Sequence, residues 1–79
     1  MRLFKKEDFK VGHWYYTEYP NSRNGNFYFQ LETKKNYRHH NSIGCTFSWV
    51  SKPLVGIYTF DLNVRTFRDM EDEEKANIL

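Results

Sequence analysis

The chain has few of the residues that mark disulfide-stabilised, membrane or low-complexity proteins. Its 79 residues include one cysteine, two prolines and four glycines. No apolar run approaches the roughly 18 residues of a membrane-spanning helix. A single cysteine cannot form an internal disulfide, and residues 1–6 lack the apolar stretch of a secretory signal. These absences exclude a disulfide scaffold and a helical membrane protein, and we expect a cytoplasmic protein.

The length restricts the fold to a single domain, residues 1–79. A chain of this size buries only about 60% of the surface that its unfolded form exposes, so its apolar residues must pack efficiently. Aromatic residues make up 19% of the chain, and their large rings can build a small core from few positions. The four glycines are isolated from one another, so no glycine-rich phosphate loop is present.

The charge is distributed unevenly along the chain. The formal net charge is +2, yet residues 1–68 hold 11 of the 12 Lys and Arg residues and only half of the ten acidic ones. The other five acidic residues lie in residues 69–79, beside Lys75. A basic body favours polyanions, and an acidic tail favours either a basic partner or the body itself. Both segments are also compatible with ordinary solvated surfaces.

Alternating apolar residues predict several short strands. Residues 14–19 and 27–33 are expected to pair as an antiparallel hairpin, because Asn24-Gly25 between them is a strong tight-turn signal. The polar residues 34–42 read as a loop, and residues 43–50 alternate again. Residues 54–62 are apolar on both faces, which predicts a central strand or one that bends between two sheets, and residues 63–67 add a short strand. The expected core is Phe29, Leu31, Phe47, Trp49 and Phe60.

The acidic tail is expected to be helical. Thr66 or Asp69 can cap the helix, and the carboxylates of residues 71–74 suit its first turns. A narrow apolar stripe is expected to dock the helix weakly, while those four acidic side chains face solvent. The stripe consists of Phe67, Met70 and Ile78.

These elements predict a mostly β fold, of α+β type: a small SH3-like antiparallel barrel of four or five strands with a short C-terminal helix. The body is residues 1–68 and the helix residues 69–79. Residues 9–16 (FKVGHWYY) resemble the beginning of small SH3-like barrels, and residues 64–68 with 73–79 resemble the closing helix of small bacteriophage accessory proteins. The resemblance implies a phage protein that binds and redirects a host component, inside the host cell. It carries over no catalytic residue, and the absence of an early acidic loop argues against binding of proline-rich peptides.

Catalysis and metal binding find little support in the residue pattern. His39 and His40 point in opposite directions in an extended chain, and Cys45 has no second cysteine to complete a metal site. Cys45 also lies on an apolar face, where a thiol behaves as an inert hydrophobic group. We therefore expect no enzyme activity, no metal and no cofactor.

The sequence leaves two binding functions open, protein binding and nucleic-acid binding. Nucleic-acid binding is the alternative, and the basic loop supports it. Cations that neutralise phosphate and a ring that stacks on a base together predict a small nucleic-acid-binding module. Its candidate residues are Arg23, Lys34, Lys35, Tyr37, Arg38, His39 and His40.

Protein binding is the preferred function. Fifteen aromatic residues exceed what so small a core needs, so some tyrosines must lie at the surface, where they anchor interfaces. The open edge of a small sheet can also pair with another chain, including a second copy of this one. The candidate partner-binding residues are Tyr15, Tyr19, Tyr28, Tyr37 and Tyr58, and the expected function is to block or redirect a host protein.

Overall fold

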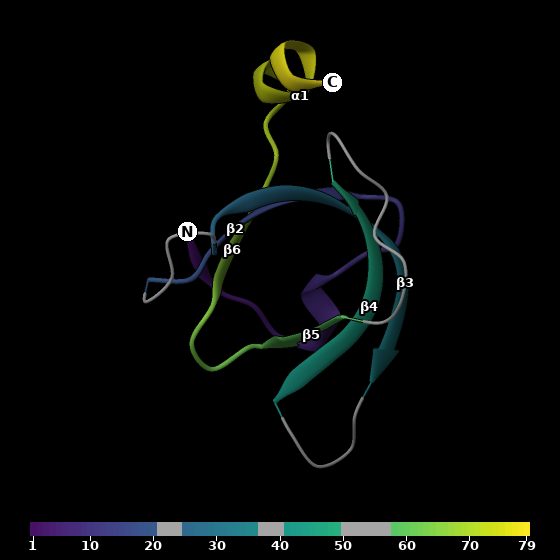
Figure 1. The fold of residues 1–79 in the computed structure, drawn as a ribbon, viewed down its shortest axis with the longest axis vertical. Coiled ribbons are helices and arrows are strands. Elements are labelled where there is room, and N and C mark those ends of the chain that lie inside the picture. Colours follow the sequence, from purple (N-terminus) through teal and green to yellow (C-terminus); the bar gives the residue numbers. More distant parts are fainter. Residues whose placement is uncertain (21–24, 37–40, 50–57) are drawn as a thin grey trace.

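The computed structural model describes residues 1–20, 25–36, 41–49 and 58–79. Six strands form one antiparallel sheet, followed by a short helix (Figure 1). The elements are β1 (Arg2–Leu3), the 3-10 turn η1 (Lys6–Asp8), β2 (Trp14–Glu18), β3 (Phe27–Asn36), β4 (Ser42–Trp49), β5 (Tyr58–Asp61), β6 (Thr66–Asp69) and α1 (Asp72–Ile78). The predicted class, mostly β with a short C-terminal helix, is confirmed. Neither helix of the described chain has the length and apolar content needed to cross a membrane.

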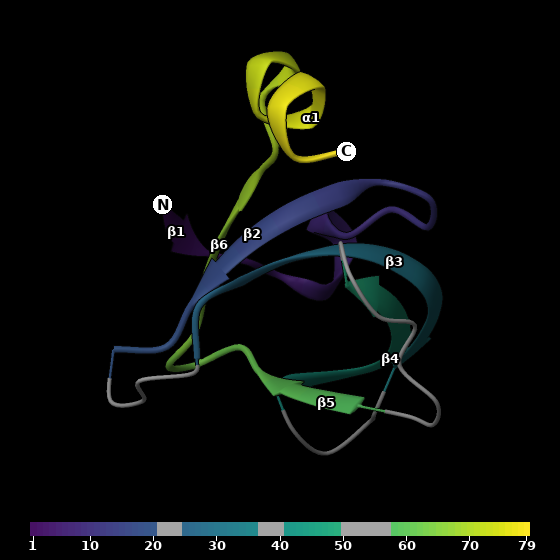
Figure 2. The ribbon, with the colours of Figure 1, turned by 45° about the horizontal axis from the view of Figure 1, so that its top comes forward.

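The strand order is β1-β6-β2-β3-β4-β5, and the sheet curls around a single core (Figure 2). Within the described residues β1 and β5 form the two edges, and no ladder of hydrogen bonds joins them. The expected barrel of four or five strands is therefore an open, curved sheet of six. The curvature brings β5 across the core from β6, where Phe60 and Phe67 meet edge to face with ring centroids 5.3 Å apart.

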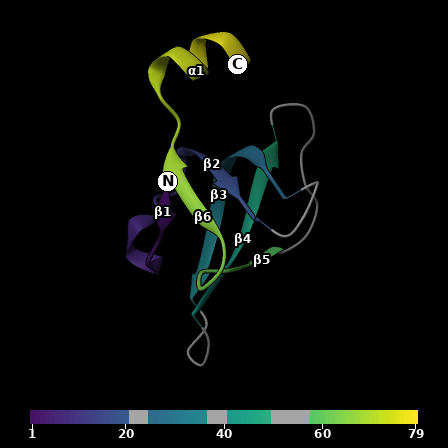
Figure 3. The same cartoon turned by 90° about the vertical axis from the view of Figure 1, so that its left-hand side faces the viewer.

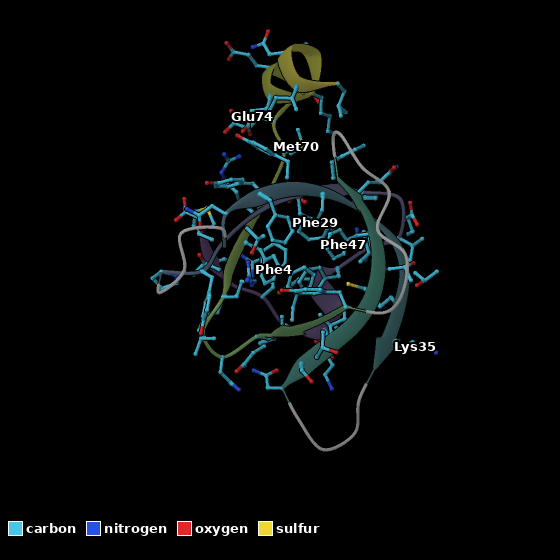
Figure 4. The ribbon with its side chains drawn as sticks, viewed as in Figure 1. Phe4, Phe29, Lys35, Phe47, Met70 and Glu74 are labelled. Carbon is cyan, nitrogen blue, oxygen red and sulfur yellow. The ribbon has the colours of Figure 1, made fainter. Side chains whose placement is uncertain are left out.

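The concave face of the sheet carries the core. The predicted alternation of β3 and β4 is confirmed, because Phe29, Leu31 and Phe47 are fully buried. Phe60 of β5 is buried as well, as expected, and the side chain of Trp49 lies outside the described set. Phe29 is the centre of the cluster, with Phe47 and Phe60 each at a centroid distance of 5.3 Å (Figure 4). Several aromatic rings thus fill the volume that aliphatic side chains fill in larger cores.

The predicted hairpin of β2 and β3 is confirmed, with Tyr15 opposite Phe29 and Thr17 opposite Phe27. The side-chain amide oxygen of Asn26 accepts a hydrogen bond from the Tyr19 N–H at 3.1 Å and ties the ends of the hairpin together. Tyr15 and Thr17 face inward, so theirs is the buried face of β2. The sequence alone does not show this, because residues 14–19 have aromatic side chains on both faces.

The prediction of a loop over residues 34–42 is wrong at both ends. β3 continues to Asn36 and β4 already begins at Ser42, with Lys34 opposite Cys45 and Lys35 opposite Gly44. A β-irregularity between Leu31 and Thr33 shifts the register before this extension. The ladder with β4 satisfies the backbone of these residues, so their polar composition does not end the strand.

The last two elements also differ from expectation. The apolar segment 54–62 yields β5 at an edge of the sheet rather than a central strand, and residues 54–57 lie outside the described chain. Thr66 and Asp69, the expected helix caps, are the first and last residues of β6, which lies between β1 and β2. The helix begins only at Asp72, so the boundary at residue 69 divides a strand. Pairing with two strands outweighs the local preference for a helix cap.

An ion pair holds α1 at one end of the sheet (Figure 3). Arg68 on the convex face of β6 forms a two-pronged contact with the Glu74 carboxylate, and its second prong, from Nη2 to Oε2, measures 2.9 Å. The Tyr28 hydroxyl donates to the same carboxylate at 2.9 Å. The expectation that Glu74 faces solvent is therefore wrong, whereas Glu71, Asp72 and Glu73 are exposed. Two residues of the expected docking stripe do not belong to the helix: Phe67 is buried in β6, and Met70 is buried in the linker between β6 and α1. The third, Ile78, is half-buried.

Candidate partner-binding site

A small hollow of about 180 Å³ opens where the end of β2 comes close to β5. It is lined by Tyr19, Tyr58, Thr59, Asp61, Val64 and Arg65. These residues meet because β6 pairs with β2 through Glu18 and Thr66, while the turn that leads to β6 starts at the end of β5. The curved sheet thus brings residue 19, which follows the interior strand β2, close to residue 58 of the edge strand β5.

A buried arginine is the main charged group of the hollow. Arg65 is only 8% exposed, and its Nη1 atom donates to the Gly25 carbonyl at 2.6 Å and to the Thr17 hydroxyl at 3.4 Å. Three rings surround its guanidinium: Tyr19 at 5.2 Å, Phe27 at 5.5 Å and Phe60 at 5.3 Å from their centroids. Burial lowers the pKa of Arg65, but an arginine keeps its charge at neutral pH. The rings partly compensate the lost hydration of the cation.

Apolar groups form the rim of the hollow. Tyr58 is 38% exposed although its ring packs on Phe47 and Phe60, with centroid distances of 5.5 and 4.9 Å. Val64 is exposed in the turn, and Tyr19 is half-buried beside Arg65. A ring fixed on the core with one side free loses little entropy when a partner covers it.

Within the described residues β5 pairs with β4 alone, and its free edge runs beside the hollow. The Leu62 N–H donates to the Asn41 carbonyl at 2.9 Å. In an antiparallel ladder every second residue bonds to the partner strand, so Phe60 bonds to Ile43. The N–H and C=O groups of Thr59, which lies between these bonded positions, point away from β4. The next outward carbonyl, that of Asp61, accepts from the N–H groups of Val64 and Arg65. Thr59 therefore offers a donor and an acceptor to a further strand at the rim of the hollow.

The five tyrosines predicted to contact a partner have different positions. Tyr19 and Tyr58 line the hollow. Tyr15 is 1% exposed, and its hydroxyl accepts from the Lys10 N–H at 2.8 Å, so its assignment to a surface is wrong. Tyr28 holds Glu74 and stacks near Tyr16, at a centroid distance of 4.7 Å, so its polar end is already used within the chain. Tyr37 lies outside the described residues.

Of the residues predicted to contact nucleic acid, only Lys34 and Lys35 lie in the described part of the chain. Lys34 is not a free loop cation: it lies in β3, and its ammonium group donates to the Phe9 carbonyl at 3.1 Å. Lys35, the next residue of the strand, is exposed and points outward (Figure 4). The remaining candidates, Arg23, Tyr37, Arg38, His39 and His40, lie outside the described part of the chain.

The only thiol is shielded in the core. Cys45 is 1% exposed, and burial raises its pKa to about 12, so almost no thiolate exists at neutral pH. A larger hollow of about 420 Å³ lies between η1, the start of β2 and α1, with Asp8 in its wall. That carboxylate accepts hydrogen bonds from the Lys5 N–H and from Arg2, which lower its pKa. In the described ranges no three His, Cys, Asp or Glu side chains are grouped to hold a metal ion.

Arg65 is the residue that sequence reasoning missed. It lies in the segment 63–67, which is predicted to be a short strand, and an arginine there reads as part of a solvated basic body. Its burial depends on Thr17 and Gly25, which lie 40 or more residues away in the chain. No local pattern signals such a contact.

No protein family model, curated protein or solved structure matches this chain.

Proposed function

We propose that this protein acts without catalysis, by binding another protein at the hollow and along the free edge of β5. The single observation that carries the proposal is the position of the outward peptide groups of Thr59 beside the exposed ring of Tyr58. Edge pairing supplies hydrogen bonds with any extended segment, and neighbouring side-chain pockets supply the choice of segment.

The nature of the partner is proposed from the sequence. The resemblance of residues 64–68 and 73–79 to the closing helix of small bacteriophage accessory proteins, together with the SH3-like beginning at residues 9–16, favours a host protein that is blocked or redirected. The strong curvature of the sheet supports the related proposal that the fold is an open variant of the SH3-like barrel (Figure 1). A second copy of this chain is the competing occupant of the edge.

Variants at Thr59 test this proposal with little change to the fold. Thr59→Pro removes one outward N–H, and proline is tolerated at an edge strand where that group faces solvent. Thr59→Ala keeps the N–H and is the matched control. We expect a host protein captured from nuclease-treated lysate by the wild type to be retained by Thr59→Ala and lost by Thr59→Pro and by Tyr58→Ser.

Two outcomes would contradict the proposal. Loss of all captured partners on nuclease treatment, together with sensitivity to Lys35→Gln, would favour the nucleic-acid-binding alternative, for which exposed Lys35 is the structural support. Concentration-dependent dimers in sedimentation that disappear in Thr59→Pro would show that the edge is occupied by a second copy.

A further inference from the structure

The buried guanidinium of Arg65 has no carboxylate to neutralise it within the described chain. The three ion pairs join Arg2 to Asp8, Arg68 to Glu74 and Lys75 to Asp72, and none includes Arg65. A buried charge without a counterion is costly, and natural proteins keep such charges paired. Asp61 shares the lining of the hollow, but its Oδ1 atom accepts from the Asn63 N–H at 2.9 Å and it makes no ion pair with Arg65.

Part of the guanidinium is still open to a ligand. Its bonds to Gly25 and Thr17 use Nη1 alone, and within the described residues Nε and Nη2 have no hydrogen-bond partner. Every fully buried side-chain nitrogen or oxygen of the described chain has a partner. Nε and Nη2 are therefore not fully buried, and they belong to a side chain that lines the hollow. Together they are the pair of atoms with which arginine binds a carboxylate in a two-pronged contact.

We propose that the hollow receives the carboxylate of an aspartate or glutamate side chain, carried by the protein segment that pairs along β5. This inference rests on the proposed function, because Thr59 at the rim supplies the strand contact that would place the acidic residue over Arg65. Side chains of a paired strand alternate between its two faces, so one acidic residue enters the hollow and its neighbours point away. The phenol groups of Tyr19 and Tyr58 are further donors in the lining.

The dimensions and charge of the hollow favour a carboxylate side chain over a nucleic-acid phosphate. A volume of about 180 Å³ accommodates a short acidic side chain, and Tyr58 with Val64 provides apolar surface for its methylene groups. Exposed Asp61 at the same site repels any anion, but it repels a nucleic acid, with one charge per nucleotide, more strongly than a single carboxylate. The single positive charge of Arg65 is neutralised by the single negative charge of one carboxylate.

A pair of capped pentapeptides, Ac-Val-Thr-Glu-Thr-Val-NH2 and its Gln counterpart, tests the inference on the full chain. Binding is followed by NMR at the Thr59 amide, which reports edge pairing, and at the Arg65 Nε–H, which reports the hollow. We expect the Glu peptide to bind about tenfold more tightly than the Gln peptide, since charge-assisted hydrogen bonds are the stronger kind. Only the Glu peptide is expected to shift the Arg65 signal.

Variants of Arg65 provide the matched control. Arg65→Met retains an apolar stem of similar length, and buried charges replaced in this way often leave a fold intact. The two peptides should bind Arg65→Met equally. The comparison of Glu and Gln peptides on the wild type needs no variant, so it decides the question even if Arg65→Met fails to fold.

The remaining outcomes separate the inference from the proposed function. Equal affinity of the two peptides, with a shifted Thr59 amide, would overturn the carboxylate pocket and leave edge binding intact. If neither peptide shifts Thr59, the proposed edge pairing fails and the inference fails with it. Inorganic phosphate or a short oligonucleotide that shifts Arg65 at lower concentration than the Glu peptide would overturn the choice of a protein carboxylate.

Discussion

Replacement of Phe29 by alanine should remove most of the stability of this protein. The ring is fully buried and contacts five other aromatic rings, which lie at centroid distances between 5.3 and 6.2 Å. Truncation of a buried phenylalanine costs about 3–5 kcal/mol, because the lost transfer free energy is increased by the cavity left behind. The lost edge-to-face pairs place Phe29 toward the upper end of that range.

That loss is large against the total stability of so small a domain. At about 0.05–0.15 kcal/mol per residue, a chain of 79 residues has a free energy of unfolding of about 4–12 kcal/mol. With a urea m-value of about 1.5 kcal/mol/M, the denaturation midpoint should fall by about 2–3 M. At the low end of the stability range the variant should be unfolded without denaturant.

Urea titrations followed by far-UV circular dichroism measure this effect. Leu3→Ala is the control, because Leu3 is exposed on β1 and its truncation should change the free energy of unfolding by less than about 0.5 kcal/mol. Phe29→Leu keeps most of the volume and should fall between the two. A midpoint for Phe29→Ala within about 0.5 M of the wild type would mean that Phe29 is not at the centre of the core, and would refute the register of β3.

Three further predictions concern individual side chains. Cys45 should resist thiol reagents at pH 8 in the folded protein and react only on unfolding, and rapid labelling of the native state would contradict its burial. The pKa of Glu74 is lowered to about 2, first by its hydrogen bonds with Arg68, so its contribution to stability is complete above its usual value of 4.5 and is lost as the pH falls through about 2. An NMR titration of the Glu74 carboxyl carbon with a midpoint near 4.5 would show that the contact with Arg68 does not form. A mixed-sequence oligonucleotide should bind weakly across a salt series, because Lys34 is already bonded to Phe9, and strong binding abolished by Lys35→Gln would overturn the preference for protein binding.

Alternation along the chain was sufficient to predict the hairpin and the buried faces of β3 and β4, but not the buried face of β2. Phe29 and Leu31 in β3, with Phe47 in β4, face inward as a period of two requires, since this pattern is a property of neighbouring residues.

The errors arose where pairing with another strand decides the structure. Lys34 and Lys35 look like a loop by composition, yet the next strand, β4, pairs with them and extends β3. Thr66 and Asp69 are good helix caps, yet β6 lies between β1 and β2, which come from the other end of the chain. In both cases hydrogen bonds to another strand outweigh a weak local preference.

The candidate site was only half predictable for the same reason. Tyr19 and Tyr58 were expected at a surface because aromatic residues are unusually numerous. Tyr15 has the same composition signal and is buried, because the face of β2 is chosen by the curvature of the whole sheet. Arg65 gave no signal, since its burial among Thr17, Gly25 and three rings exists only in the folded chain.

The place of β6 has a consequence for the synthesis of this protein. β6 lies between β1 and β2, so a strand near the C-terminal end of the chain separates two strands near the other end. During translation β1 and one side of β2 therefore lack their partner until residues 66–69 have been made, and the core with Phe67 cannot close before that point. Pairings between residues so far apart make folding slow compared with that of helical proteins of equal size. Nascent chains of this protein thus depend on late folding, and a chain that stops before β6 leaves two unpaired edges open to aggregation.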